Sequence, residues 1–387
     1  MEDAPRHPPS PILHPQRVLV RGVNWLGDAV MATPALLRLR EQFPDAHVAL
    51  FTPEKLQELW RHHPAVNETI ALGPGEGLFA AGRRLRAGNF DLALVLPNSP
   101  RSALEVFLAR IPRRLGYARP WRNWFLTDAL PSRPGAVKMR KRSAAEIRRL
   151  VAGAGTPGAD RQSPIANPAA HQLHEYLHLA AALGANPAPL PPRLFVAPEE
   201  VDEARRKFGL AEMRSPVLGL NPGAEYGPAK RWPIEKFIAA AREIQQRTNC
   251  AWLIFGGAGD VETAQHIEAE IRNPKSEIRN FAGRTSLREL IALLKLCRVL
   301  LTNDTGPMHV AAALGTTVVV PFGSTSPELT GPGLPGDARQ RLLKSGAVCS
   351  PCFLRECPID FRCLNGIAVE QVVEAVVEAY RHSQPPA

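Results

Sequence analysis

The sequence predicts a two-domain α/β protein in which each domain holds a parallel β-sheet with helical crossovers. Three observations lead to this prediction. The chain has 387 residues, and domains usually divide once they exceed about 250 residues. Short β-rich runs alternate with segments of helical periodicity, which is typical of parallel sheets. The alternation is interrupted once, by a stretch rich in Pro, Gly, Ser and Arg at residues 131–170.

The first half opens with a strand at residues 17–21 (RVLVR), a glycine-containing loop and a helix in MATPALLRLREQF, where apolar residues recur at helical spacing. Further strands are predicted at residues 48–52, 69–72 and 91–97. Helices are predicted in PEKLQELWRHH, GLFAAGRRLRAG and HQLHEYLHLAAALGA. A Pro-rich stretch follows the last of these, so the domain boundary is placed near residue 187.

The second half repeats the alternation and therefore predicts a second Rossmann-like domain. Its strands are predicted at residues 217–221, 251–257, 298–304 and 316–323. Helices are predicted in IEKFIAAAREIQQR, from Val261 onward, in SLRELIALLKLC and in HVAAALG. The final helix, AVEQVVEAVVEAYRHS, has an apolar stripe and must pack on a domain. We expect it to pack back across the domains.

Composition and length give the remaining organisation. With 45% hydrophobic and 22% charged residues, the chain is a globular protein and neither disordered nor fibrous. It lacks an apolar run of about 18–20 residues, and its start lacks a signal-peptide pattern, so we expect a cytoplasmic protein. The predicted parts are a disordered leader at 1–16, a first domain at 17–187 with a basic insertion at 131–170, a second domain at 188–348, and a cysteine cluster with the final helix at 349–387.

The net charge of +10 is concentrated in one segment. Between Arg101 and Arg149 there are thirteen Lys or Arg residues against three Asp or Glu. An anionic membrane surface or a phosphorylated lipid explains this surplus. Nucleic acid is not predicted as a partner, because the basic run has no interleaved aromatic residues and matches no groove-reading module. A solvated loop without a specific role stays an alternative.

Asp28 follows the first strand in the motif Asn24-Trp25-Leu26-Gly27-Asp28. Ligands of open parallel sheets bind beyond the carboxyl ends of the strands, so this carboxylate faces a predicted site. It could act as a general base toward an acceptor hydroxyl. It could equally cap the following helix, because Asp is a favoured N-cap residue.

Two further motifs combine a strand end, glycine and polar residues at a helix entrance. In NPGAEYGPAKRWP (221–233), Asn221, Gly223, Lys230 and Arg231 suit a phosphate oxygen, and a solvated loop is the alternative. In NDTGPMH (303–309), backbone N–H groups at Thr305 and Gly306 would point out of a helix start, where an anion is favoured. We predict a diphosphate-binding turn there. His309 alone would more often be a core histidine.

A glycine-rich loop, GGAGDVE at 256–262, carries the acids Asp260 and Glu262, which could hold ribose hydroxyls. Its spacing does not match GxGxxG, so a nicotinamide cofactor is not predicted. Four cysteines form a C-x2-C-x4-C-x5-C cluster: Cys349, Cys352, Cys357 and Cys363. Structural zinc at these thiols is one reading, an iron–sulfur cluster a second, and reduced or redox-active thiols a third.

Together, NWLGDAVMATP, NPGAEYGPAKRWP, NDTGPMHVAAALGT with FGSTSPELTGP, and CSPCFLRECP resemble the ADP-heptose:lipopolysaccharide heptosyltransferases of glycosyltransferase family 9. The resemblance runs from about Arg17 to Val376. It implies a GT-B architecture of two Rossmann-like domains facing across a cleft. It also implies inverting transfer of heptose from ADP-heptose to a heptosyl-Kdo2-lipid A acceptor, with no metal required.

The resemblance also implies residue roles. Asp28 matches the family's base, and Lys230 matches the cation of the K-x-W-P element that contacts donor phosphate. Asp304, Thr305, Gly306 and His309 match the turn that holds the diphosphate and the heptose, while Glu262 is a looser match for the ribose. Acceptor-binding residues are expected in the first domain at Asn24, Trp25, Asn98 and Arg101. The insertion at 131–170 departs from the family pattern and leaves the acceptor's exact structure open.

Two other functions stay open from the sequence. One is a related GT-B transferase that uses another nucleotide sugar or acceptor, because the fold does not name the sugar. The other is a non-catalytic metal or redox protein in which the cysteine cluster is the active part.

Overall fold

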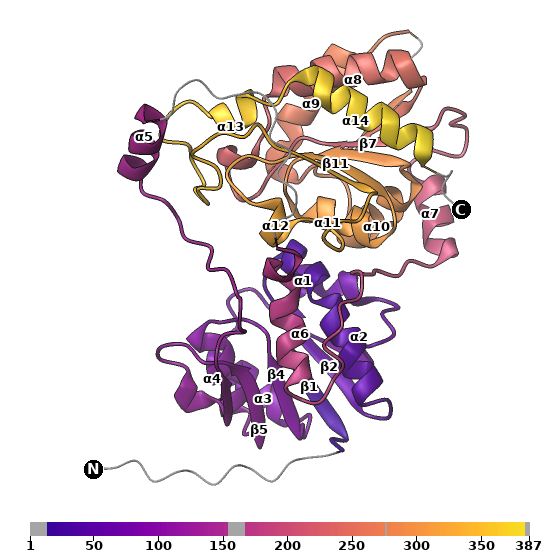
Figure 1. The fold of residues 1–387 in the computed structure, drawn as a ribbon. Helices are drawn as coiled ribbons and strands as arrows, with labels where there is room; N and C mark the ends of the chain where they lie inside the picture. Colours follow the sequence, from indigo (N-terminus) through magenta and orange to yellow (C-terminus); the bar gives the residue numbers. More distant parts are fainter. Residues whose placement is uncertain (1–13, 154–166, 275–276, 384–387) are drawn as a thin grey trace. The chain divides into compact units, whose positions relative to one another are not determined.

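The computed structural model describes residues 14–153, 167–274 and 277–383, and the chain divides into two compact units (Figure 1). The first unit comprises Met1–Ala136 and Leu173–Leu190. The second comprises Val137–Gln172 and Pro191–Ala387. Within the described residues each unit contains one six-stranded sheet whose strand pairs are all parallel.

The sheet of the first unit has the order β3-β2-β1-β4-β5-β6. Its strands are β1 (Arg17–Arg21), β2 (His47–Pro53), β3 (Glu68–Leu72), β4 (Leu92–Val95), β5 (Arg113–Tyr117) and β6 (Asp128–Leu130). Its helices are α1 (Leu26–Met31), α2 (Thr33–Gln42), α3 (Leu78–Arg86), α4 (Pro100–Leu108) and α6 (Leu173–Ala181), with 3₁₀-helices η1 (Glu54–Trp60) and η2 (Asn123–Phe125). The central strand β1 is paired at both edges, and its residues 18–21 are buried.

The sheet of the second unit has the order β12-β11-β10-β7-β8-β9. Its strands are β7 (Val217–Asn221), β8 (Ala251–Ile254), β9 (Ile278–Asn280), β10 (Val299–Thr302), β11 (Thr317–Pro321) and β12 (Gln340–Leu343). Its helices are α5 (Ala144–Ala152), α7 (Pro198–Lys207), α8 (Ile234–Thr248), α9 (Val261–Ile271), α10 (Leu287–Leu296), α11 (Gly306–Ala313), α12 (Pro327–Thr330), α13 (Arg362–Asn365) and α14 (Val369–His382), with η3 (Pro168–Ala170), η4 (Pro228–Lys230) and η5 (Ala258–Asp260). When the strands of each unit are numbered from the first in that unit, both sheets have the Rossmann strand order 3-2-1-4-5-6.

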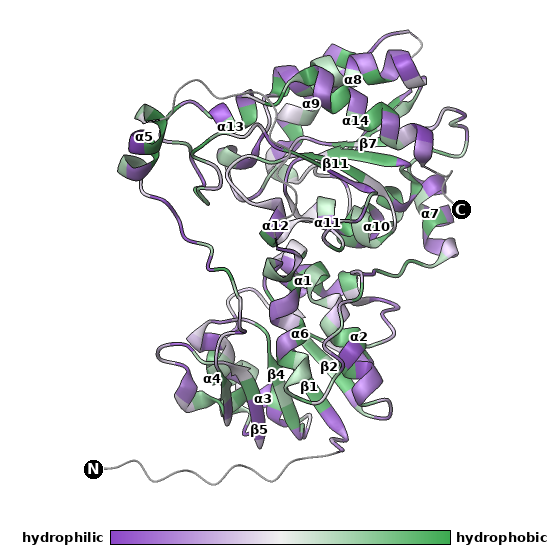
Figure 2. Cartoon of the chain, in the orientation of Figure 1, coloured by the Kyte–Doolittle hydropathy of each residue, from purple (hydrophilic) through white to green (hydrophobic). Residues whose placement is uncertain are grey.

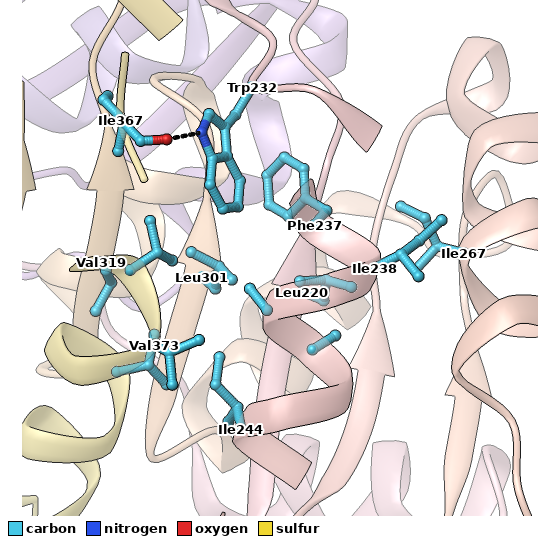
Figure 3. Packing of buried hydrophobic residues seen from close by; sticks show 14 of the residues in the cluster. Leu220, Trp232, Phe237, Ile238, Ile244, Ile267, Leu301, Val319, Ile367 and Val373 are labelled. Carbon is cyan, nitrogen blue, oxygen red and sulfur yellow. Dashed lines mark hydrogen bonds between the residues drawn. The ribbon is translucent and has the colours of Figure 1, made fainter. Parts of the chain in front are cut away.

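The core of the second unit lies between its sheet and the helices α8 and α14. Val373 of α14 and Ile244 of α8 pack against Leu301 of the sheet, and the helices lie alongside each other (Figures 1 and 3). The indole Nε1–H of Trp232 donates to Ile367 O at 3.3 Å (Figure 3). The final helix is therefore part of the second unit, and its predicted packing across the domains stays a prediction.

Hydropathy follows this layering. Figure 2 shows apolar residues along the strands, whereas α8 and α14 each carry an apolar and a polar face. Burial of such faces is what holds amphipathic helices on a sheet. In the part of the chain that the structure describes, no helix combines the length and apolarity needed to cross a bilayer.

Several details of the predicted elements were wrong, and the helices α5 and α7 were not predicted. PEKLQELWRHH forms the 3₁₀-helix η1, and the short strands β5, β6, β9 and β12 were missed. Strands β6, β9 and β12 lie at or beside sheet edges and carry polar residues, so they lack the continuous apolar run of a central strand.

The insertion predicted for the first domain groups largely with the second unit. Ile147 of α5 is buried in the core of that unit, and the Arg142 N–H donates to Cys352 O at 3.0 Å. The assignment failed because local sequence does not say which domain a short amphipathic helix will pack on. Residues 154–166 of this stretch, and residues 1–13 of the predicted leader, lie outside the described residues. The leader's Gln16 N–H donates to Asp91 Oδ2 at 2.8 Å.

Candidate functional site

The polar motifs follow the strands at which each sheet reverses its order. In the second unit these strands are β7 and β10, which pair in register at Asn221 and Thr302. In the first unit they are β1 and β4. Ligands of open α/β sheets bind beyond the carboxyl ends of the strands at such a switch point. The fold therefore places a candidate site in each unit.

Asn303 joins the two loops of the second-unit site. Its side-chain oxygen accepts from Trp232 N at 2.9 Å, and its nitrogen donates to Pro222 O at 2.6 Å. Asn221, predicted to bind the donor, is buried and donates to Thr302 Oγ1 at 3.0 Å. Both amides hold the fold of the site together.

An ion pair lies at the centre of this site. The Lys230 ammonium is 2.7 Å from Asp304 Oδ2, and the side chains are 14% and 4% exposed. The hydroxyl of Thr325 donates to the same carboxylate oxygen. Lys230 Nζ also lies 5.0 Å from the centre of the Tyr226 ring. The lysine predicted from the sequence is thus held by Asp304 and Tyr226, and Asp304 directly precedes the N-cap residue of α11.

The start of α11 supplies backbone donors beside this ion pair. Thr305 is the N-cap residue and Gly306 begins the helix, and both are only partly buried. Their N–H groups have no hydrogen-bond partner within the described residues, whereas the Met308 N–H returns to Thr305 O at 3.1 Å. The helix dipole adds positive potential at this end. The turn is therefore suited to a phosphate group.

His309 lies in the first turns of the same helix and is 5% exposed. Burial lowers its pKa to about 4; nearby Asp304 acts in the opposite direction, and His171 and Lys230 lower it further. The imidazole is therefore neutral at pH 7 and can offer a hydrogen bond without adding charge. Its burial agrees with both interpretations made from the sequence, a core histidine and a residue of the diphosphate-binding turn.

Asp260 connects the glycine-rich loop at 256–262 with the loop at 221–233 that carries Arg231. Its carboxylate accepts from Gly257 N at 3.0 Å and lies 3.6 Å from Arg231. A Cβ on Gly223 would lie 2.2 Å from Asp260 Oδ2, so any larger residue there would require the Asp260 side chain to move. Glu262 is exposed in the first turn of α9. Of the two acids proposed for a ribose, Glu262 is the more accessible.

The four clustered cysteines line one enclosed cavity of about 10 Å³, close to the room of a single water molecule. Cys357 Sγ accepts from Phe361 N at 3.3 Å. Burial and then the neighbouring thiols raise the pKa of Cys363 to about 12. Within the described residues, no three His, Cys, Asp or Glu side chains are arranged to hold one metal ion. The four cysteines lie together, as the sequence predicted, but in the described residues their side chains are not arranged as ligands of one metal ion.

In the first unit, Asp28 is not the helix cap. The N-cap residue of α1 is Trp25, and Asp28 lies in the first helical turn, partly buried. The capping alternative left open by the sequence is therefore removed. The carboxylate lies just beyond the carboxyl end of β1, as a base toward a ligand in this unit would require.

A pocket of about 450 Å³ lies at the carboxyl ends of β1, β2 and β3 in the first unit. The predicted residues Asn24 and Arg101 line it, together with Arg21 and Lys55. Arg21 and Arg101 both pair with Glu105, at 2.7 Å and 3.1 Å. The pocket is therefore lined by three cationic side chains and one carboxylate, Glu54, while Glu105 compensates two of the cations.

The other predicted acceptor residues lie outside its lining. Trp25 is 48% exposed, and Lys55 Nζ lies 5.6 Å from the centre of its ring. The Asn98 side chain accepts from Arg122 at 3.4 Å. Sequence reasoning missed Arg21, Lys55 and Thr325. The sequence held a signal for each of them. Arg21 is the last residue of a predicted strand, Lys55 closely follows one, and Thr325 lies in a run of hydroxyl residues after another.

Each unit is a Rossmann-like domain, and the whole chain matches structures of GT-B glycosyltransferases. The structure of ADP-heptose lps heptosyltransferase II from E. coli matches this chain with a TM-score of 0.72 at 28% identity, over 94% of this chain and 98% of that one. A family 9 glycosyl transferase from Veillonella parvula matches with a TM-score of 0.74 at 23% identity, over 96% and 99%. The predicted fold class is confirmed.

The family model described as Glycosyltransferase family 9 (heptosyltransferase) matches residues 136–361. Lipopolysaccharide heptosyltransferase 2 of Salmonella typhimurium is 34% identical over 323 residues, which is 82% of this chain and 85% of that protein. Its Escherichia coli counterpart is 32% identical over the same shares. The chain belongs to glycosyltransferase family 9, as the motifs predicted.

Proposed function

We propose that the protein transfers heptose from ADP-L-glycero-D-manno-heptose to heptosyl-Kdo2-lipid A in the assembly of the lipopolysaccharide inner core, with inversion at the anomeric carbon. The observation that carries this proposal is the Lys230–Asp304 pair beside the open start of α11, at the switch point of the second sheet. The curated relatives compared above are heptosyltransferases 2, which favours this donor and this step.

The donor is assigned to the second unit. As the bond between the anomeric carbon and ADP breaks, negative charge grows on the departing phosphate. Lys230 and the N–H groups of Thr305 and Gly306 would stabilise that charge, and such fixed donors are usually the largest catalytic contribution. Asp304 and the neutral His309 would hydrogen-bond the sugar, and Glu262 the ribose.

The acceptor is assigned to the first unit. Its Kdo carboxylates are anionic, so the pocket formed by Arg21, Lys55 and Arg101 offers complementary charge. Asp28 would remove the proton of the acceptor hydroxyl as the oxygen bonds to the anomeric carbon. We propose no metal for this step, since Lys230 and the start of α11 already supply positive charge at the leaving group.

The test is ADP release by the purified protein from ADP-heptose, with and without an acceptor that carries one heptose. Release that depends on this acceptor and exceeds release from other nucleotide sugars is expected. A folded protein that binds ADP-heptose but transfers nothing would point to a different acceptor. Equal use of other nucleotide sugars would contradict the assigned donor.

The cysteine cluster is proposed to bind structural zinc, with its thiols turning toward the cavity that all four line. Purified protein is then expected to contain about one zinc ion per chain. Cys352→Ser should lose the metal and lower the melting temperature, whereas Cys250→Ala, at an isolated buried cysteine, should keep the metal. Metal analysis of the three proteins decides this. Wild-type protein with reduced thiols and no metal would leave the cluster as buried thiols.

We also propose that the protein works at the cytoplasmic face of the inner membrane. Lys138 and Lys141 are exposed beside the exposed apolar Val137 and Met139, a combination suited to an anionic lipid surface. Replacing both lysines by serine should weaken binding to phosphatidylglycerol vesicles by about tenfold or more, at about 1 kcal/mol per charge. The matched control is the double variant Arg83→Ser/Arg86→Ser, which removes two exposed charges from α3. Equal losses in both variants would show a general charge effect only.

A further inference from the structure

The segment Cys349–Cys363, named the cysteine loop, is bonded to one wall of the second-unit site. The N–H groups of Cys352 and Phe353 both donate to Ser324 O, at 3.0 Å and 2.7 Å. The Ser350 hydroxyl donates to Gly323 O at 2.7 Å. These bonds fix the turn that carries Thr325, the hydroxyl partner of Asp304. The cysteine loop is thus part of the architecture of the site.

A second set of bonds joins the cysteine loop to the loop that carries Lys230. The Tyr226 hydroxyl donates to Phe353 O at 2.7 Å, and the Ala229 N–H donates to Arg355 O at 3.0 Å. Gly227 has φ 144°, and a Cβ there would lie 2.7 Å from Arg355 O. The backbone of Arg355 is therefore held closely against the loop that positions the lysine.

The Arg355 side chain is anchored at one end and open at the other. Its Nε donates to Tyr226 O at 2.7 Å, and its Cζ lies 5.3 Å from the centre of the Tyr226 ring. The terminal guanidinium nitrogens make no hydrogen bond or ion pair with the described residues, and the side chain is exposed. A guanidinium held at Nε keeps its two terminal donors in a fixed fork, the geometry that fits a phosphate.

Arg355 and Lys230 share the same aromatic ring. Lys230 Nζ lies 5.0 Å and Arg355 Cζ 5.3 Å from the ring centre of Tyr226, so the two charges are at most about 10 Å apart, the sum of these distances. Asp304 already compensates the lysine. Among the described residues Arg355 has no carboxylate partner of this kind, so a ligand would not have to displace one to reach it.

We propose that Arg355 is a further donor-binding residue, whose terminal nitrogens contact a phosphate oxygen of the nucleotide sugar. This inference rests on the proposed function, because it takes the second unit as the donor side. The same chemistry could recognise an anionic group of the acceptor. The donor is favoured because Lys230, the α11 turn and Arg355 all belong to one unit.

The test is ADP binding, measured by calorimetry at low salt on wild type, Arg355→Gln and Arg355→Lys. A charged hydrogen bond contributes enough that Arg355→Gln should weaken ADP binding by about tenfold or more. Adenosine, which lacks phosphate, should bind wild type and Arg355→Gln equally. Arg355→Lys should recover part of the lost ADP affinity. Arg339→Gln, which removes an exposed arginine paired with Asp337, is the matched control and should bind ADP as wild type does.

Three results would overturn the inference. Unchanged ADP affinity in Arg355→Gln would remove the contact, and an equal loss for adenosine would show a structural effect on the whole site. An unchanged donor KM with a raised acceptor KM would assign the arginine to the acceptor. The proposed function has a separate test. If wild-type protein bound ADP but transferred no heptose, the proposed function would fail, and ADP binding by the Arg355 variants would still test this inference.

Discussion

Asp28→Asn is expected to lower kcat by about 10²- to 10⁴-fold, the usual contribution of a general base. The amide keeps the size of the carboxylate but cannot accept the proton of the acceptor hydroxyl. ADP affinity should be unchanged, because the donor is assigned to the other unit. Steady-state kinetics and ADP calorimetry on the same preparation measure both quantities.

Asp45→Asn is the matched control for this substitution. Asp45 is an exposed carboxylate of the first unit, so its variant should keep wild-type turnover. A melting temperature close to wild type in Asp28→Asn would exclude a folding defect. Full turnover by a well-folded Asp28→Asn protein would show that another group removes the proton.

Lys230→Met is expected to lower kcat by about 10²- to 10³-fold, as loss of a fixed donor at a developing negative charge does. It should also weaken ADP binding, since the ammonium would contact phosphate in the bound state. Removal of the lysine leaves Asp304, only 4% exposed, without its cation, so the free energy of unfolding should fall by about 1–3 kcal/mol. Kinetics, calorimetry and urea unfolding report the three effects.

A double variant separates catalysis from stability. Adding Asp304→Asn to Lys230→Met removes the uncompensated carboxylate and should restore most of the stability, while turnover stays low. Lys207→Met, which breaks an exposed ion pair with Glu289 in the same unit, should change neither property strongly. Turnover that returned with stability in the double variant would mean that Lys230 acts only through the fold.

The central strands and the motif loops could be predicted because both depend on local sequence. RVLVR and the run at residues 217–221 form strands that are largely buried. Gly27 lies at the start of the helix after β1, and Gly306 begins the helix after β10. Strand alternation then predicted that the motifs lie beyond the carboxyl ends of strands. The strand order that makes these positions a switch point is known only from the structure.

The missed features depend on distant partners. Arg21 appeared as the last residue of a strand, and only the fold brings Glu105, 84 positions away, within 2.7 Å of it. The association of α5 with the second unit depends on Ile147 entering a core built from residues beyond 217. Local periodicity could predict neither contact, because it carries no information on which surfaces meet.

The Lys230–Asp304 pair also has a consequence for product release. The Lys230 ammonium has the Asp304 carboxylate at 2.7 Å, so the protein itself compensates the charge of this lysine. If Lys230 binds the ADP phosphate as proposed, Asp304 would replace the phosphate as its partner when ADP leaves, which would lower the electrostatic cost of dissociation. The same carboxylate would compete with the incoming donor.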